Sequence, residues 1–130
     1  MRAFLCILAI LATCHAAFAT EQSADSTTGS TPRKVFVVPL SGDVEPGMSA
    51  FLTRALRDAR EYQNPIIVLE LDTYGGRVDA AFDIVDTMLT VPAAQTLAYV
   101  TTKAISAGAL IALSCGKLYM EPHTTIGDVA

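Results

Sequence analysis

The chain has 130 residues, and hydrophobic residues make up 52% of them, which allows one packed domain and excludes a chain that is disordered throughout. Its formal net charge is −4, and the basic residues are dispersed along the sequence. We therefore expect no nucleic-acid partner, because binding to a phosphate backbone needs a concentration of Lys and Arg.

Residues 1–19 have the pattern of a secretory signal peptide. Arg2 precedes an apolar run over residues 3–12 that is too short to span a bilayer, and Ala17-Phe18-Ala19 resembles a cleavage site. We expect cleavage after Ala19, export, and a periplasmic or membrane-associated location in a bacterium. An uncleaved N-terminal anchor is the alternative, and lipidation at Cys14 is a lesser option.

Residues 20–33 are rich in Ser and Thr and nearly devoid of apolar side chains, so they predict a disordered linker. Cleavage would remove Cys6 and Cys14, which leaves Cys115 as the single cysteine of the mature chain and excludes an internal disulfide. Cys115 lies in an apolar run and is expected to be a small buried hydrophobe. Without Arg2, eight basic residues face thirteen acidic ones, a net charge of −5.

From residue 34 onward, strand and helix patterns alternate. Apolar, β-branched runs predict strands over residues 35–40, 66–71, 96–100 and 117–120. Apolar residues at helical spacing predict a helix that begins at Pro46 and is stopped by Asn64-Pro65, and two further helices over residues 78–89 and 104–114. A turn is predicted over residues 73–76. The alternation predicts an α/β domain with a parallel sheet. The near-continuous apolar character of residues 66–71 predicts that both faces of that sheet are covered.

The second predicted helix, residues 78–89, is expected to turn one face toward the core and the other toward solvent. The residues expected to face the core are Val78, Ala81, Phe82, Val85, Met88 and Leu89. Asp79, Asp83 and Asp86 share the opposite face, and without His or Cys partners they are typical of a solvated surface rather than of a metal site. We expect neither a metal nor a cofactor, since no G-x-G-x-x-G motif follows a strand.

Two loops follow strands at the edge of the sheet where sites form in parallel α/β folds. The first is the glycine segment, residues 72–77, in which Gly75 and Gly76 indicate either an anion-binding site or a tight turn with positive φ. Asp72 is expected to cap this turn. The second loop carries Ser106, which composition alone leaves undecided between a helix N-cap and a nucleophile. Lys103, just before it, is expected to point to solvent.

Three ordered segments resemble the NfeD-type membrane serine proteases of the Clp-protease/crotonase superfamily: Leu69–Ala81, Ala104–Ala109, and Tyr119–Pro122 followed by Thr124–Gly127. The first corresponds to the D-T-P-G-G motif of that family, with Tyr74 in place of the usual proline. The second matches the segment that carries the nucleophile. The resemblance covers residues 34–130 and implies a parallel-sheet α/β domain of the Clp-protease/crotonase type.

What the resemblance implies is peptide-bond hydrolysis by a serine endopeptidase. Ser106 would attack the scissile carbonyl, the amides of Gly76 and Ala107 would donate to the oxyanion, and Gly75 would shape the turn. The general base would be a lysine about forty residues after the serine, in a Ser–Lys dyad. That position lies beyond Ala130, so we expect a truncated protease domain with little or no activity alone. His123 is expected to be a surface turn residue rather than a base.

The resemblance also implies partners and leaves alternatives open. A peptide or membrane-protein substrate, membrane association and a homo-oligomer are the expected partners. A non-catalytic scaffold or chaperone-like protein of the same fold is an alternative function. A crotonase-like acyl-CoA enzyme is a weaker one, because acyl-CoA is cytosolic and the chain begins with an export signal.

Overall fold

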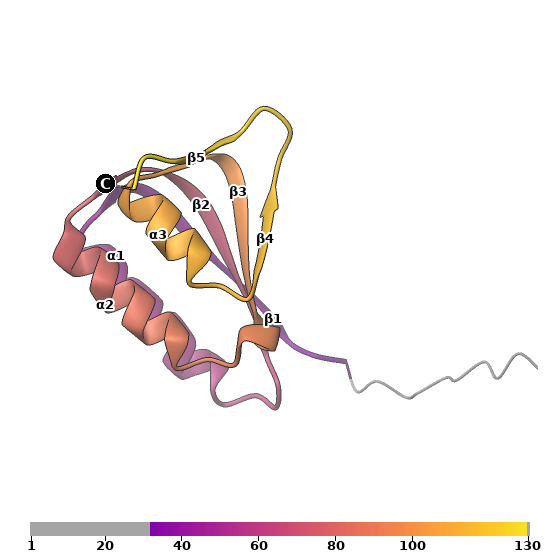
Figure 1. The fold of residues 1–130 in the computed structure, drawn as a ribbon. Helices are drawn as coiled ribbons and strands as arrows, with labels where there is room; N and C mark the ends of the chain where they lie inside the picture. Colours follow the sequence, from indigo (N-terminus) through magenta and orange to yellow (C-terminus); the bar gives the residue numbers. More distant parts are fainter. Residues whose placement is uncertain (1–31, 130) are drawn as a thin grey trace, which may run out of the picture. The chain divides into compact units, whose positions relative to one another are not determined.

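Strands and helices alternate through residues 32–129, the part of the chain that the computed structural model describes (Figure 1). The predicted signal peptide, Cys14 and residues 20–31 of the predicted linker lie outside the described residues. The elements are β1 (Val35–Val44), α1 (Pro46–Ala59), β2 (Ile66–Gly76), α2 (Val78–Leu89), the 3-10 turn η1 (Ala93–Gln95), β3 (Thr96–Ile105), α3 (Ala107–Leu113), β4 (Lys117–Met120) and β5 (Thr125–Gly127).

The strands form one parallel sheet in the order β1-β2-β3-β4, and β5 pairs with the end of β3. The predicted parallel α/β fold is therefore confirmed. Connections in such sheets have the same hand, so a strand order that never reverses places every crossover helix on the same face. Figure 1 shows α1, α2 and α3 together on one side of the sheet.

The prediction that both faces of the sheet are covered is wrong for the described residues, because α1, α2 and α3 lie on one side of it (Figure 1). On the helix-facing side, alternate residues of the two central strands are almost inaccessible, with Leu69, Leu71 and Val100 all at 0% exposure. On the other side, Val35 and Val37 of β1 are 53% and 57% exposed. The apolar character of β2 came from its central place in the sheet, since Val68 is half-buried by neighbouring strands alone.

Two strands run further than their apolar runs predict. The predicted turn at residues 73–76 continues β2, because Val44 of β1 still pairs with Gly76. The third strand extends to Ile105, where Ala104 pairs with both Thr73 and Ile126. The last helix consequently begins at Ala107 rather than at Ala104. These extensions bring the ends of β2 and β3 together around Ser106.

The first helix follows the prediction at its start and differs at its end. Pro46 lies in its first turn, where a missing amide costs nothing, and Leu52 and Leu56 face the core. The helix ends at Ala59, ahead of the predicted stop at Asn64-Pro65. Among the described residues, no helix is both long and apolar enough to cross a membrane.

The core face of α2 differs from the prediction. Ile84 and Met88 are the deeply buried large side chains, at 0% and 1% exposure. Val78, Phe82 and Leu89, which were expected to face the core, are 64%, 52% and 66% exposed. Small Ala80 and Ala81 occupy the buried side in their place, so the helix approaches its neighbours closely and leaves apolar side chains at the surface.

Candidate functional site

Ser106 lies directly after β3 and before α3, at the carboxyl edge of the sheet. Its backbone has φ 51° and ψ −116°, a conformation that costs a non-glycine residue about 1–3 kcal/mol. It occupies the N-cap position of α3, but its hydroxyl makes no capping hydrogen bond, and a capping serine normally has extended backbone angles. The residue is exposed. A strained, exposed serine whose hydroxyl is not used for capping favours a chemical role over a capping one.

The strand that follows fixes this strained residue from behind. The Ser106 amide donates to the Gly127 carbonyl over 2.8 Å, and β5 pairs with β3 up to Ile105. Because its proton is already used, the Ser106 amide does not serve as an oxyanion donor. The next amide, that of Ala107, lies in the first turn of α3.

The glycine segment reaches Ser106 because Gly75 has no side chain. Gly75 has φ 103°, and a Cβ there would lie 2.8 Å from the Ile105 carbonyl oxygen and 3.1 Å from Ser106 Cβ. The same Cβ would lie 3.1 Å from the Ala107 nitrogen. A Cβ on Gly76 would overlap the Val44 backbone. The two glycines are therefore required by close approach of backbone, and not by positive φ alone.

Backbone amides of the glycine segment have defined directions. The Gly75 amide donates to Thr73 Oγ1 over 2.9 Å, and the Arg77 amide donates to the Val44 carbonyl of β1 over 2.7 Å. The Gly76 amide lies between these two fixed amides. The structure thus brings Gly75, Ser106 and Ala107 together, and Gly76 follows Gly75 directly in the chain.

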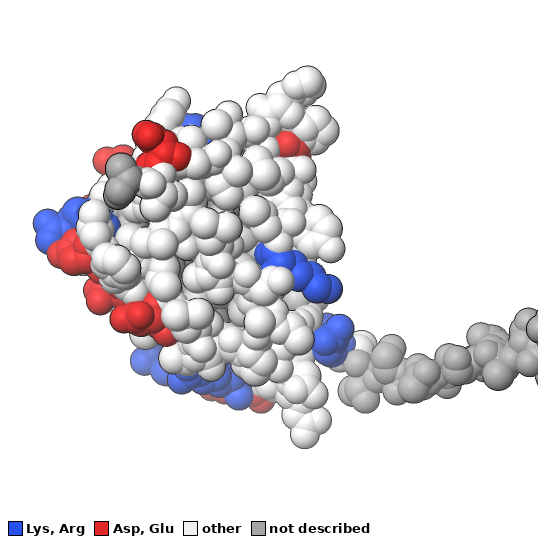
Figure 2. Space-filling model, in the orientation of Figure 1, with Lys and Arg blue, Asp and Glu red and all other residues white. Residues whose placement is uncertain are grey.

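An apolar cleft of about 190 Å³ opens beside Ser106. The residues that line it come from α2, the start of α3 and the C-terminal stretch: Val78, Ala81, Phe82, Ser106, Ala107, Leu110 and Val129. Figure 2 shows an uncharged surface over α3, between charged groups along the α1 and α2 edge and a few more on the opposite side, near β4. The cleft therefore suits an apolar side chain of a ligand.

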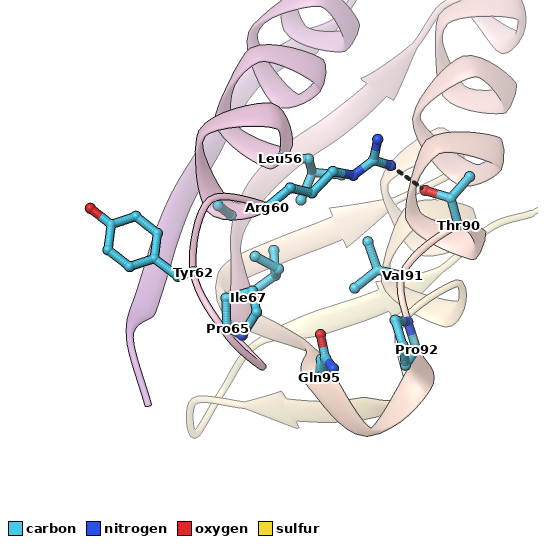
Figure 3. Close-up of a pocket in the computed structure, with 10 residues that line it drawn as sticks. Leu56, Arg60, Tyr62, Pro65, Ile67, Thr90, Val91, Pro92 and Gln95 are labelled. Atoms are coloured by element: carbon cyan, nitrogen blue, oxygen red, sulfur yellow. Dashed lines mark hydrogen bonds between the residues drawn. The ribbon is translucent and has the colours of Figure 1, made fainter. Parts of the chain in front are cut away.

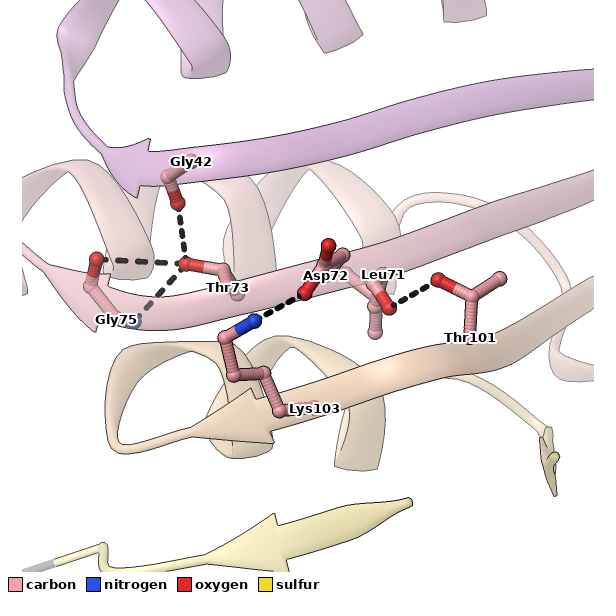
Figure 4. A network of polar contacts seen from close by, with 7 residues as sticks. All are labelled: Gly42, Leu71, Asp72, Thr73, Gly75, Thr101 and Lys103. Carbon is pink, nitrogen blue, oxygen red and sulfur yellow. Dashed lines mark hydrogen bonds and ion pairs between the residues drawn. The ribbon is translucent and has the colours of Figure 1, made fainter. Parts of the chain in front are cut away.

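Lys103 does not point freely to solvent, as the sequence led us to expect. Its Nζ lies 2.6 Å from Asp72 Oδ1 and 4.5 Å from the centre of the Tyr74 ring, and the side chain is 21% exposed (Figure 4). Asp72 accordingly holds Lys103 rather than capping the turn. The hydrogen bond that Lys103 donates to Asp72 raises the pKa of Lys103, which keeps its ammonium protonated and unsuited to act as a base.

Other reactive side chains among the described residues lie outside this arrangement. His123 is exposed, with φ 66°, in the turn between β4 and β5, and it does not line the cleft. Burial raises the pKa of the Cys115 thiol to about 11, so this half-buried thiol is protonated at neutral pH. No cluster of three or more His, Cys, Asp or Glu side chains within residues 32–129 could hold a metal ion.

A second hollow, of about 210 Å³, lies near the start of β2 and the end of α2 (Figure 3). Apolar side chains line it, and the Arg60 guanidinium donates to Thr90 Oγ1 over 3.0 Å at its rim. It is lined by no residue of the glycine segment and not by Ser106. The reactive groups thus belong to the cleft at the other end of the strands.

Sequence reasoning missed three contributors to the site. Thr73 accepts the Gly75 amide, Gly127 holds the Ser106 amide, and Phe82 lines the cleft. Phe82 had the spacing of a core residue, and no local signal separates an apolar core face from an apolar cleft. Gly127, which precedes Asp128 and has φ 144°, could have been suspected as a special backbone position.

The chain was compared with known families and proteins. Residues 34–130 match the family model of the NfeD1b N-terminal domain. "Membrane protein NfeD1b" of Bacillus subtilis (strain 168) is 40% identical over 96 residues, which make up 74% of this chain and 22% of that protein. The chain therefore spans about a fifth of the length of this curated relative.

Solved structures give a consistent likeness. A "1510-N membrane protease specific for a stomatin homolog from Pyrococcus horikoshii" is 32% identical, with a TM-score of 0.65 over 75% of this chain and 50% of that chain. A lysine-to-alanine mutant of the 1510-N stomatin-specific protease, in complex with a substrate peptide, is also 32% identical, with a TM-score of 0.66 over 75% and 45%. ClpP1 from Listeria monocytogenes, at 22% identity and a TM-score of 0.56 over 61% and 46%, shows a shared fold alone.

Proposed function

The chain belongs to the NfeD1b family through its N-terminal domain, and from this membership we propose that it carries the nucleophile of a serine endopeptidase. The observation that carries the proposal is Ser106 itself. It is exposed and held in a strained backbone conformation. The glycine segment lies directly against it, which is possible because Gly75 has no side chain. The protease-like fold supports the same function.

The proposed reaction uses backbone amides to stabilise charge. Ser106 Oγ attacks the carbonyl carbon of the scissile peptide, and the new C–O bond moves the carbonyl electron pair onto oxygen. The amides of Gly76 and Ala107 donate to this oxyanion, and loss of one such donor typically costs about 3 kcal/mol of transition-state stabilisation. Collapse of the intermediate breaks the C–N bond, and the leaving amine takes the proton that the general base removed from Ser106. An acyl-enzyme remains, which water hydrolyses.

The proposed general base is a lysine that follows residue 130, in a Ser–Lys dyad. A desolvated lysine with a lowered pKa can accept the serine proton, but the pKa of Lys103 is shifted in the opposite direction by Asp72. That a lysine-to-alanine mutant of the similar stomatin-specific protease was captured with a substrate peptide is in keeping with a lysine in the chemistry. The complete active site would then include sequence beyond the described residues.

The proposed substrate is an apolar stretch of a peptide or membrane protein. The cleft beside Ser106 is lined by Phe82, Leu110 and Val129, and no charged residue contributes to it. Burying an apolar side chain there contributes about 25 cal/mol of favourable binding free energy for each Å² of surface removed from water. The N-terminal pattern and the name of the Bacillus relative support a protein that is exported, periplasmic or membrane-associated, and we propose a homo-oligomer.

The test is labelling of the full-length protein with a fluorophosphonate probe, which reacts with activated serines. We expect Ser106→Ala to abolish labelling. Ser114→Ala, which removes a half-buried hydroxyl at the other end of α3, is expected to leave it intact. Folded protein that is never labelled would contradict the endopeptidase and favour a non-catalytic scaffold. Binding of an acyl-CoA thioester without labelling would favour the crotonase-like alternative.

A further inference from the structure

One buried hydroxyl lies where the end of β1, the glycine segment and α3 meet. Thr73 is 1% exposed, and its Oγ1 donates to the Gly42 carbonyl over 2.5 Å while accepting the Gly75 amide over 2.9 Å (Figure 4). A hydroxyl has one proton, so its longer approach to the Gly75 carbonyl, at 3.4 Å, competes with the bond to Gly42. The side chain therefore links the glycine segment to the neighbouring strand.

This hydrogen bond limits the directions open to the amide that follows. By accepting the Gly75 amide, Thr73 fixes the peptide plane between Tyr74 and Gly75. The Arg77 amide is fixed in turn by its bond to the Val44 carbonyl of β1. The amide of Gly76 lies between these two fixed peptide planes.

The methyl group of Thr73 contacts the other half of the site. A Cβ on Gly108 would lie 2.5 Å from Thr73 Cγ2, so the methyl group occupies the space that a side chain at Gly108 would need. Gly108 is in the first turn of α3, two residues after Ser106. One side chain thus touches both the segment that supplies the Gly76 amide and the helix that follows the nucleophile.

We propose that Thr73 is a positioning residue, whose hydroxyl orients the Gly76 amide toward Ser106 and whose methyl group sets the distance between the glycine segment and α3. The inference rests on the proposed function, because orientation of an amide affects reactivity only if an oxyanion forms there. Thr73 touches no substrate and acts through Gly75 and Gly76.

Another threonine of the chain provides a matched control. Thr96 is 3% exposed, donates to the Ala93 carbonyl over 3.2 Å and accepts the Gly116 amide over 2.8 Å. It reproduces the same buried hydrogen-bond pattern at the start of β3, at the opposite end of the sheet from Ser106. Replacing either threonine with valine removes a hydroxyl, keeps the shape, and leaves one glycine amide without its partner.

The experiment compares fluorophosphonate labelling rates of the full-length wild type with those of three variants, each alongside urea unfolding. We expect Thr73→Val to lower the rate constant by about tenfold to a hundredfold, the range that misplaced catalytic groups produce. Thr73→Ser keeps the hydroxyl and loses the methyl group, so its rate is expected to lie between those of the wild type and Thr73→Val. Thr96→Val is expected to lose comparable stability and retain the wild-type rate.

Several outcomes would overturn the inference. Labelling of Thr73→Val at the wild-type rate would do so, as would equal losses in the two valine variants. Hydrogen exchange of the Gly75 amide in the wild type tests the geometry without any variant, and exchange as fast as that of an exposed amide would also overturn it. A folded wild type that is not labelled would instead reject the proposed function, and this inference with it.

Discussion

Residues with unusual backbone angles meet at the proposed active site. Ser106 has φ 51°, Gly75 has φ 103° and Gly127 has φ 144°. A Cβ on Gly75 would lie 3.1 Å from Ser106 Cβ, and the Ser106 amide donates to the Gly127 carbonyl, so both glycines contact Ser106. Only Ser106 has a side chain, and it is the residue for which the conformation is costly. A glycine at position 106 would relieve the backbone strain. That a serine with an exposed hydroxyl stands there instead is in keeping with selection for chemistry over stability.

Gly75 offers a test of whether contact or φ makes glycine necessary. Gly42 also has a positive φ, 88°, but a Cβ there meets nothing within 4 Å, so Gly42→Ala is expected to cost only the backbone strain of about 1–2 kcal/mol. Gly75→Ala adds an overlap with the Ile105 carbonyl and should cost at least about 2 kcal/mol more. Urea unfolding of both variants measures the difference, and equal losses would show that the close approach of the two loops is not rigid.

At the level of elements, the order of strands and helices could be read from the sequence, because apolar periodicity reports burial directly. Strand ends could not be read, since Thr73 to Gly76 look like a turn and become strand only by pairing with β1. The three-residue β5 carries too short an apolar pattern to be detected. The side of the sheet that the helices cover depends on strand order, which local patterns do not encode.

The candidate site, like the fold, was predicted only in part from the sequence. Ser106, Gly75, Gly76 and Ala107 were found from motifs in the sequence, and in the structure Gly75 approaches both Ser106 and Ala107. Their chemical roles remain proposals. Lys103 was misplaced because a lone lysine is usually solvated, and its partner Asp72 is distant in sequence and adjacent only through the pairing of β2 with β3.

The ion pair between β2 and β3 predicts a pH dependence of stability. Asp72 raises the pKa of Lys103 in the folded state above its ordinary value of 10.5, so the folded state binds the proton more tightly than the unfolded state does. The resulting stabilisation is fully present below pH 10.5 and is lost as the pH rises through the raised pKa. We expect the free energy of unfolding to fall more steeply above pH 10.5 in the wild type than in Lys103→Met.

Lys117→Met is the control for that comparison. Lys117 is exposed on β4, and no ion pair involving it occurs among the residues that the structure describes. Its removal is expected to leave the alkaline slope of the wild type unchanged. Parallel slopes for wild type and Lys103→Met, measured by urea unfolding across the alkaline range, would show that the pair does not stabilise the sheet.

For the folded unit as a whole, the helical side carries an unusual amount of exposed apolar surface. Leu89 of α2 and Leu113 of α3 are each 66% exposed, and Val129 is 54% exposed beside the proposed active-site cleft. In Figure 2 the surface over α3 carries no charged side chains, while charged side chains line the α1 and α2 edge and a few lie on the opposite side, near β4. Apolar surface of this kind promotes association in water.

Replacing Leu89 and Leu113 should therefore raise the solubility of the protein without changing its fold. We expect Leu89→Gln with Leu113→Gln to raise the protein concentration at which light scattering begins, because both side chains lie at the surface and contribute little to the core. The free energy of unfolding should stay within about 0.5 kcal/mol of wild type. Tyr62→Gln removes a 47% exposed ring near the second hollow, away from the cleft, and controls for a general gain in polarity. An equal effect from Tyr62→Gln would mean that association does not depend on the α2 and α3 surface.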